Sequence, residues 1–303
     1  MRAIDKSRAL YFDYGESMLK EKFPDLYPRI ATGLVGHGSE CYGYDDEISR
    51  DHDYETGFYI FIGDDVDSRQ EFLLSRAYDA LIKEHVRRDS LHSAYDGSLG
   101  VVRISDFYRR YKGYSGAPET LSDWLDIPSE YLAEAVNGEV FYDGSGEFSR
   151  IREDIKSVPL DVKYKRLSRC LIEMAQSGQY NYSRCIRHGE YGAARLALNR
   201  FVENASEAVF VLNDAFTPYY KWRFRAMRDL PMLDWAAAEL ELILFYPPTE
   251  TDAINNLIEE FCSKIAAELR RKHLSAATDD FLEPHAYAVR DLIKDNNLRN
   301  DYI

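Results

Sequence analysis

The first half of the chain alternates between helical and strand-like patterns of apolar residues. Leu74, Tyr78 and Leu81 recur at helical spacing, whereas residues 58–62 form a continuous run of β-forming side chains. Glycines and polar residues separate such segments, which is typical of short turns. The pattern predicts helices over 5–22, 67–88 and 129–138, the last capped by Ser129, and strands over 30–35, 54–62, 101–105 and 139–142.

Strand patterns nearly vanish after about residue 155. Helical patterns follow one another with a single break at Pro247 and Pro248, and no flexible linker divides the chain. These helices are predicted over 160–177, 189–212, 217–228, 232–245, 251–273 and 281–294. We therefore expect an α/β (α+β) domain with a mixed sheet over residues 1–155. An all-helical domain over 156–303 should follow it, and the cleft between the two should hold the site.

Length, charge and cysteine content narrow the class of protein. The 303 residues suit two domains, and a hydrophobic content of 45% provides for real cores. A net charge of -14 argues against bulk attraction to nucleic acid or to anionic membranes. The four cysteines form no C-x-x-C pair, which disfavours zinc and a disulfide framework. The N-terminus is charged and amphipathic, and no stretch is long enough to span a membrane, so we expect a cytoplasmic protein.

The strongest chemical signal is the pair Asp51 and Asp53, which leads into the predicted strand over 54–62. Alternate residues of an extended chain share a face, so these carboxylates should point the same way, with Cα atoms roughly 7 Å apart. Two parallel carboxylates repel each other unless a cation lies between them. Magnesium prefers such hard oxygen ligands and commonly shares its coordination shell with substrate phosphates. The pair therefore predicts a magnesium site.

A tight turn precedes this pair, at residues 36–39 (Gly-His-Gly-Ser). Gly38 would let the backbone approach a phosphate closely, and a turn beginning at Ser39 would direct backbone N–H groups at the anion. The Ser39 hydroxyl adds one more donor. Donors and a metal together stabilise the charge that develops in phosphoryl or nucleotidyl transfer. We therefore expect Gly38 and Ser39 to hold the phosphates of a nucleotide.

This arrangement resembles a known signature. Gly-Ser followed after about a dozen residues by Asp-x-Asp is characteristic of the polymerase-beta-like nucleotidyltransferase superfamily. The longer strings at 36–53, 137–143 and 218–222 look like an uncharacterised bacterial family of that superfamily. Its relatives with an α/β head and a helical tail include the aminoglycoside nucleotidyltransferases. The resemblance implies a nucleotidyltransferase-like fold, magnesium and an ATP-type donor. It leaves the acceptor open among a small molecule, a protein and an RNA end.

The superfamily usually carries a third carboxylate on a neighbouring strand. On the predicted strand over 101–105, Arg103 and Ser105 share the open face, and neither is an acid. Asp106 at the strand end is the first candidate to complete the metal site or to activate the acceptor hydroxyl, and Asp143 is the second. Without a third carboxylate, the protein would bind nucleotide without turning it over.

A basic group in the helical half offers a further phosphate contact. Lys221, Arg225 and Arg228 have i, i+4, i+7 spacing, so one helix face can carry all three. The alternative is an ordinary solvent-exposed face. Lys221 is the preferred phosphate ligand because its aromatic neighbours, Tyr220 and Trp222, suggest partial burial.

Three functions therefore stay open. The first is magnesium-dependent transfer of a nucleoside monophosphate from a nucleoside triphosphate to an acceptor hydroxyl. The second is a nucleotide-binding regulatory module with a degraded catalytic centre. The third is a metal-dependent phosphohydrolase, suggested by the doublet His52-Asp53, although such doublets lie on helices and Asp53 leads into a predicted strand. His37 and His52 are expected to have structural or supporting roles.

Overall fold

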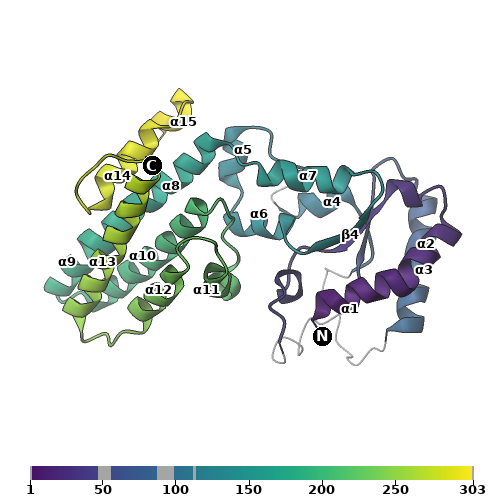
Figure 1. Cartoon of the computed structure of the whole chain (residues 1–303), viewed down its shortest axis with the longest axis horizontal. Coiled ribbons are helices and arrows are strands. Elements are labelled where there is room, and N and C mark those ends of the chain that lie inside the picture. Colours follow the sequence, from purple (N-terminus) through teal and green to yellow (C-terminus); the bar gives the residue numbers. More distant parts are fainter. Residues whose placement is uncertain (1, 47–55, 87–98, 112–113, 302–303) are drawn as a thin grey trace. The chain divides into compact units, whose positions relative to one another are not determined.

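The chain forms two compact units (Figure 1). The computed structural model describes residues 2–46, 56–86, 99–111 and 114–301. The first unit comprises Met1–Glu119 and Asp126–Ser157, and the second comprises Thr120–Leu125 and Val158–Ile303. The short segment 120–125 thus belongs to the helical unit, although it precedes the boundary that the sequence suggests near residue 155.

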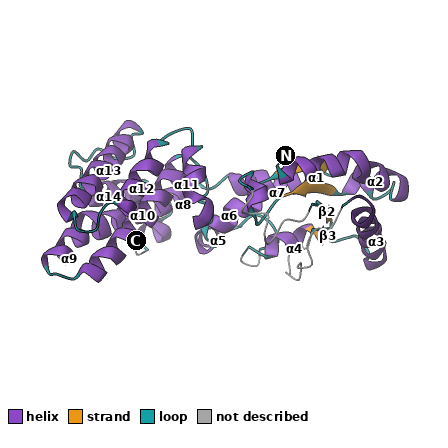
Figure 2. Cartoon of the chain, turned by 90° about the horizontal axis from the view of Figure 1, so that it is seen from below, coloured by secondary structure: helices purple, strands orange, loops and turns teal. Residues whose placement is uncertain are grey.

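The first unit contains a four-stranded mixed sheet, and Figure 2 shows its strands beside the covering helices. The strand order is β3-β2-β1-β4. Strand β1 is antiparallel to both neighbours, whereas β2 and β3 are parallel and connected by a helical crossover. The bounds are β1 (Ala31–Leu34), β2 (Tyr59–Ile62), β3 (Val101–Arg103) and β4 (Glu139–Asp143). The predicted mixed sheet, in an α+β unit followed by helices, is confirmed.

Helices cover both faces of this sheet. Ile60 and Ile62 of β2 pack on one face with α1, α2 and α3, whereas Phe61 stacks on Phe148 at 3.9 Å and contacts Phe107 on the other face. This two-sided burial explains why β2 is apolar at every position instead of alternating. The helices are α1 (Ala3–Leu10), α2 (Glu16–Lys22), α3 (Ser68–His85), α4 (Ile104–Arg109), α6 (Ser129–Val136) and α7 (Glu147–Lys156). Shorter helical turns are η1 (Tyr11–Gly15), η2 (Tyr27–Arg29) and η3 (Ser39–Tyr42).

Two local predictions were wrong. The strand predicted over 101–105 ends at Arg103, and helix α4 begins at the next residue because Ile104, Phe107 and Tyr108 are buried at helical spacing. Ser129 does not cap its helix. It is the first residue of α6, whose N-terminal cap position is occupied by Pro128. Apolar β-branched residues continue across the end of β3, so the pattern alone does not mark where the strand ends.

The described residues of the second unit form helices joined by loops and turns, and no strand occurs among them. Its largest apolar cluster forms around α8, α10, α12 and α13, where Phe201 and Phe261 are fully buried. The bounds are α5 (Leu121–Asp126), α8 (Leu160–Met174), η5 (Ala175–Tyr182), α9 (Ser183–Arg187), α10 (Tyr191–Leu212), α11 (Tyr220–Arg228), α12 (Trp235–Phe245), α13 (Thr251–Arg271), α14 (Leu282–Asp291) and α15 (Asn296–Asn300). No helix among the described ranges is long and apolar enough to cross a membrane.

Two helices contain wide π-helical turns, η1 and η5, and each holds a glycine against an aromatic ring. A Cβ atom at Gly15 would lie 2.7 Å from the ring of Phe58, and one at Gly178 would lie 2.3 Å from the ring of Phe201.

All three tryptophans of the chain belong to the second unit, at positions 124, 222 and 235. The first unit is rich in tyrosine and phenylalanine instead.

Candidate functional site

The Gly-His-Gly-Ser turn directly follows β1. Gly36 and Gly38 have φ angles of 105° and 116°, a region that side chains with a Cβ rarely adopt. A Cβ atom at Gly38 would also lie 2.3 Å from Oε1 of Glu40. Ser39 then begins the helical turn η3. Both glycines are therefore required by the backbone itself, as the sequence predicted for a close turn.

Asn137, just after α6, holds this turn against the sheet. Its Oδ1 accepts a hydrogen bond from the N–H of Gly36 at 2.7 Å, and its Nδ2 donates to the carbonyl of the same residue at 2.6 Å. The next residue, Gly138, has φ of 68°, and a Cβ atom there would lie 2.1 Å from the carbonyl oxygen of Leu34. Asn137 and Gly138 thus fix how β1 passes into the turn.

Ser39 is nearly buried, with 8% of its surface exposed. Its carbonyl accepts from the N–H of Tyr44 at 2.9 Å, which closes η3. Within residues 2–46, 56–86, 99–111 and 114–301, no group forms a hydrogen bond with the Ser39 hydroxyl.

A buried carboxylate lies beside the turn. The side chain of Glu134 on α6 is 9% exposed, and its Oε1 lies 2.9 Å from Nδ1 of His37, whose own side chain is 79% exposed. Burial raises the pKa of the Cys41 thiol well above its usual value, and the carboxylates of Glu40 and Glu134 raise it further. Sequence patterns assigned no role to Glu134, because it is an acid on the buried face of an ordinary amphipathic helix.

The predicted metal ligands, Asp51 and Asp53, lie outside the described residues, as does His52. The structure does describe the strand to which they lead. Tyr59, the first residue of β2, pairs with Gly33 of β1. The start of β2 therefore lies beside the end of β1 that enters the Gly-His-Gly-Ser turn.

The two candidates for a third carboxylate are both engaged locally. Asp106 lies in the first turn of α4, about half exposed, and pairs with Arg109 at 2.7 Å. Asp143 accepts hydrogen bonds at 2.8 Å from the N–H groups of Gly146 and Ser149, and these bonds hold the residues where α7 begins. Asp143 also pairs with Ala31, the first residue of β1, at the end of the strands that is remote from the turn. The end of β3, which precedes Asp106, lies at that same end of the strands, because residue 103 pairs with residue 62.

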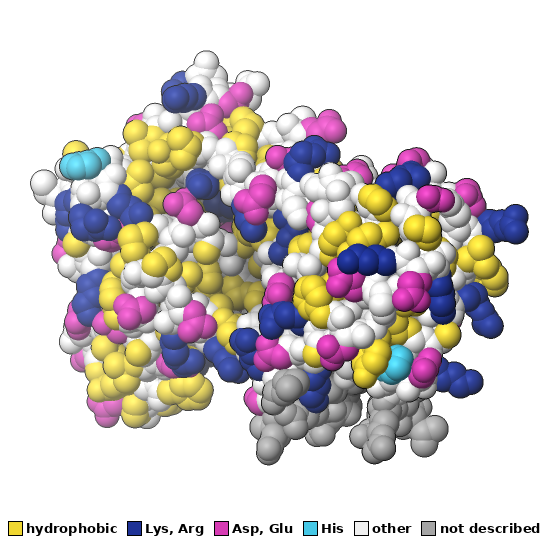
Figure 3. Space-filling view, turned by 45° about the vertical axis from the view of Figure 1, so that its right-hand side comes forward, with side chains coloured by type: hydrophobic (Ala, Val, Ile, Leu, Met, Phe, Trp, Pro, Cys, Tyr) yellow, Lys and Arg dark blue, Asp and Glu magenta, His cyan; other side chains and the backbone are white. Residues whose placement is uncertain are grey.

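Lys221 is the second residue of α11 in the second unit, and its side chain is exposed. The partial burial predicted from its aromatic neighbours was wrong. Arg228, on the same helix, forms an ion pair with Glu241 at 2.6 Å. Over the face drawn in Figure 3, acidic and basic side chains are interspersed and do not form a patch of one sign.

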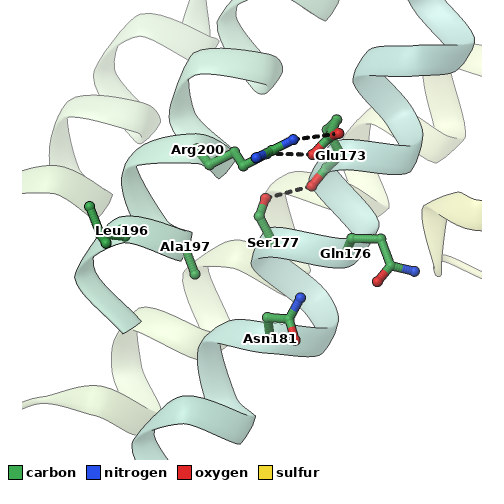
Figure 4. A pocket seen from close by; sticks show the side chains of 7 residues that line it. All are labelled: Glu173, Gln176, Ser177, Asn181, Leu196, Ala197 and Arg200. Carbon is green, nitrogen blue, oxygen red and sulfur yellow. Dashed lines mark hydrogen bonds and ion pairs between the residues drawn. The ribbon is translucent and has the colours of Figure 1, made fainter. Parts of the chain in front are cut away.

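The structure contains one cavity beside the turn in the first unit and another in the second unit. One, of about 240 Å³, adjoins η3 and is lined by Cys41, Tyr42 and Gly138 among others. The other, of about 250 Å³, lies in the second unit between η5 and α10 (Figure 4). There Arg200 forms a bidentate ion pair with Glu173 at 2.5 and 2.7 Å, so the charged groups neutralise each other. In the described ranges, no three metal-binding side chains come together.

Part of the chain matches a known protein family. The sequence model of a family described as a domain of unknown function (DUF4037) matches residues 124–223, roughly a third of the chain. No curated protein matches. The matched region contains Glu134, Asn137 and Lys221, and it ends before most of the second unit. The chain thus has a segment similar to an uncharacterised family, as the sequence predicted.

Proposed function

We propose that the protein is a magnesium-dependent nucleotidyltransferase that moves a nucleoside monophosphate from a nucleoside triphosphate, ATP first among them, to an acceptor hydroxyl. The observation that carries the proposal is the turn after β1. Gly38 has a positive φ and would let a phosphate approach the backbone, and the nearly buried Ser39 would add its hydroxyl as a donor. The strand that follows Asp51 and Asp53 starts beside that turn.

The residues of this site would act mainly by positioning and by stabilising charge. Gly38 and Ser39 would hold the donor's phosphates, while Asp51 and Asp53 would be the metal ligands. Magnesium held by these carboxylates would supply charge neutralisation for the triphosphate and for the pyrophosphate that leaves. Lys221 would add a charge-assisted hydrogen bond to a phosphate. The cysteines at 41, 170 and 262 are buried free thiols, which fits a reducing compartment such as the cytoplasm.

A second candidate function is favoured by the two engaged aspartates. Asp106 pairs with Arg109 and Asp143 caps a turn, so neither supports the third carboxylate of the superfamily. A nucleotide-binding regulatory module would need Gly38 and Ser39 but not a third acid. The two functions differ in one product, because only the transferase releases pyrophosphate.

The deciding experiment measures melting temperature and pyrophosphate release with ATP, in magnesium and in chelator. Small polyols, amino sugars and RNA 3′ ends serve as acceptors. ATP at a hundred times its dissociation constant should add about 2.7 kcal/mol of stability, and only with magnesium. Asp51→Asn and Asp53→Asn should each remove this shift and the release, whereas Asp106→Asn serves as the matched control and should retain both. An equal shift in chelator would contradict the metal site, and a shift without release would favour the regulatory module.

A further inference from the structure

His37 and Glu134 form a pair that resembles the acid–histidine half of a catalytic triad. His37 lies between two glycines whose φ angles of 105° and 116° hold it at the surface of the turn. Its Nδ1 is 2.9 Å from Oε1 of Glu134, a normal hydrogen-bond distance. The carboxylate is nearly buried whereas the imidazole is 79% exposed. The histidine therefore connects a buried acid to the surface at the Gly-His-Gly-Ser turn.

This geometry selects one form of the imidazole. An ionised carboxylate can only accept a hydrogen bond, so a hydrogen bond to an ionised Glu134 requires the proton of the neutral ring to be on Nδ1. The other nitrogen, Nε2, is then the basic one. In serine-protease triads, an acid in this position orients the histidine that takes up the proton.

The hydrogen bonds of Asn137 and Arg152 form a clamp that holds both the turn and the end of α6, where Glu134 lies. Glu134 lies in the last turn of α6. The buried Arg152 donates hydrogen bonds to the carbonyl of Val136, the last residue of α6, at 2.7 Å and to that of Asn137, just after the helix, at 2.8 Å. Asn137 in turn binds both backbone polar groups of Gly36, the residue before His37. Both partners of the pair are thus held by one network of hydrogen bonds, as a general base and its orienting acid require.

We infer that His37 is the general base for the acceptor hydroxyl and that Glu134 is the residue that positions it; this inference rests on the proposed nucleotidyl transfer. Nε2 of His37 takes the hydroxyl proton as the acceptor oxygen bonds to the α-phosphorus. The bond from that phosphorus to the oxygen bridging toward the β-phosphate breaks, and the electron pair leaves with pyrophosphate. The proton remains on the imidazolium until solvent accepts it. With Asp106 and Asp143 engaged locally, His37 is a base already at the turn.

The first test needs no activity. Long-range ¹⁵N–¹H correlation spectra of the unmodified protein, with the His37 signal assigned by its loss in His37→Gln, report which ring nitrogen carries the proton. We expect the Nδ1–H form at pH values where the ring is neutral. An Nε2–H form would overturn the inference whatever the protein's function. This spectrum also decides the role of Glu134 if Glu134→Gln does not fold.

The second test measures pyrophosphate release with α-labelled ATP and magnesium, with the acceptor that the unmodified protein uses best or with water. His37→Ala should lower kcat by about 10²–10⁴-fold while leaving KM for ATP and the magnesium-dependent thermal shift unchanged. Added imidazole should restore release in proportion to its concentration, because the vacated position is exposed. Glu134→Gln should lower kcat in the same direction without altering KM. His188→Ala, the same change at an exposed histidine of the second unit, is the matched control.

The outcomes separate the two proposals. Full activity of His37→Ala, or a loss that imidazole does not restore, would overturn the general base and leave nucleotidyl transfer standing. Absence of both ATP binding and pyrophosphate release in the unmodified protein would overturn the proposed function, and the general base with it.

Discussion

Replacing Asn137 with alanine removes both hydrogen bonds that tie the Gly-His-Gly-Ser turn to the end of α6. The backbone N–H and carbonyl of Gly36 lose partners at 2.7 and 2.6 Å. A neutral hydrogen bond contributes about 0.5–1.5 kcal/mol net, and a buried group left without its partner costs about 1–3 kcal/mol. Because Asn137 is only partly buried, water can replace some of this, and we expect a local loss of about 2–4 kcal/mol.

Hydrogen–deuterium exchange of peptides covering β1 and the turn measures this loss where it occurs. Exchange from locally opened states accelerates tenfold for each 1.4 kcal/mol, so the turn should exchange about 30-fold to about 700-fold faster in Asn137→Ala. Asn204→Ala is the control, since the half-buried Asn204 of α10 donates a hydrogen bond to the carbonyl of Arg200 in its own helix and is not part of the turn. Its effect should stay within about 0.5 kcal/mol. Unchanged exchange at the turn in Asn137→Ala would refute the role of the clamp.

Three further predictions follow from single contacts. Gly138→Ala should destabilise the first unit by more than about 2 kcal/mol in urea denaturation, because the new Cβ would lie 2.1 Å from a β1 carbonyl oxygen. The control Gly192→Ala, whose new Cβ in α10 would meet nothing within 4 Å, should be neutral or stabilising. Equal effects of the two substitutions would contradict the contact at Gly138. Lys221→Ala should weaken binding of ATP by roughly 1.5–3 kcal/mol and binding of adenosine by little, as measured by calorimetry; equal losses would assign Lys221 to another role. In native protein at pH 8, iodoacetamide should modify Cys185 before Cys41, because Cys41 is buried and its raised pKa keeps it protonated at that pH; mass spectrometry showing Cys41 modified first would contradict this burial.

The sequence predicted the elements that have a strong local pattern. Helix α3 repeats buried residues at helical spacing, and β2 is a compact apolar run, so each was predictable from its own residues. The turn was predictable because two glycines separated by one residue, Gly36 and Gly38, are typical of a tight turn. The end of β3 was not, because Ile104 suits a strand as well as the helix that it begins.

The residues that contact the turn could not be predicted from the sequence, for a different reason. Glu134 lies 97 residues from His37 in sequence, and Asn137 lies 101 residues from Gly36. No local periodicity connects residues that far apart. Asn137 and Gly138 did stand in a string that resembles the uncharacterised family, but a resemblance names residues without saying what they contact. The contacts of Asn137 and Glu134 with the turn are therefore known only from the folded structure.

The distribution of tryptophan gives the protein two separate optical reporters. Light that excites tryptophan alone registers only the second unit, because all three indoles are there, whereas tyrosine emission also samples the first unit. A nucleotide held solely by the Gly-His-Gly-Ser turn would thus be silent in tryptophan fluorescence unless the second unit responds to it. If Lys221 contacts the triphosphate, the adjacent Trp222 should change its emission on binding. A single titration would then show whether one unit or both take part in holding the ligand.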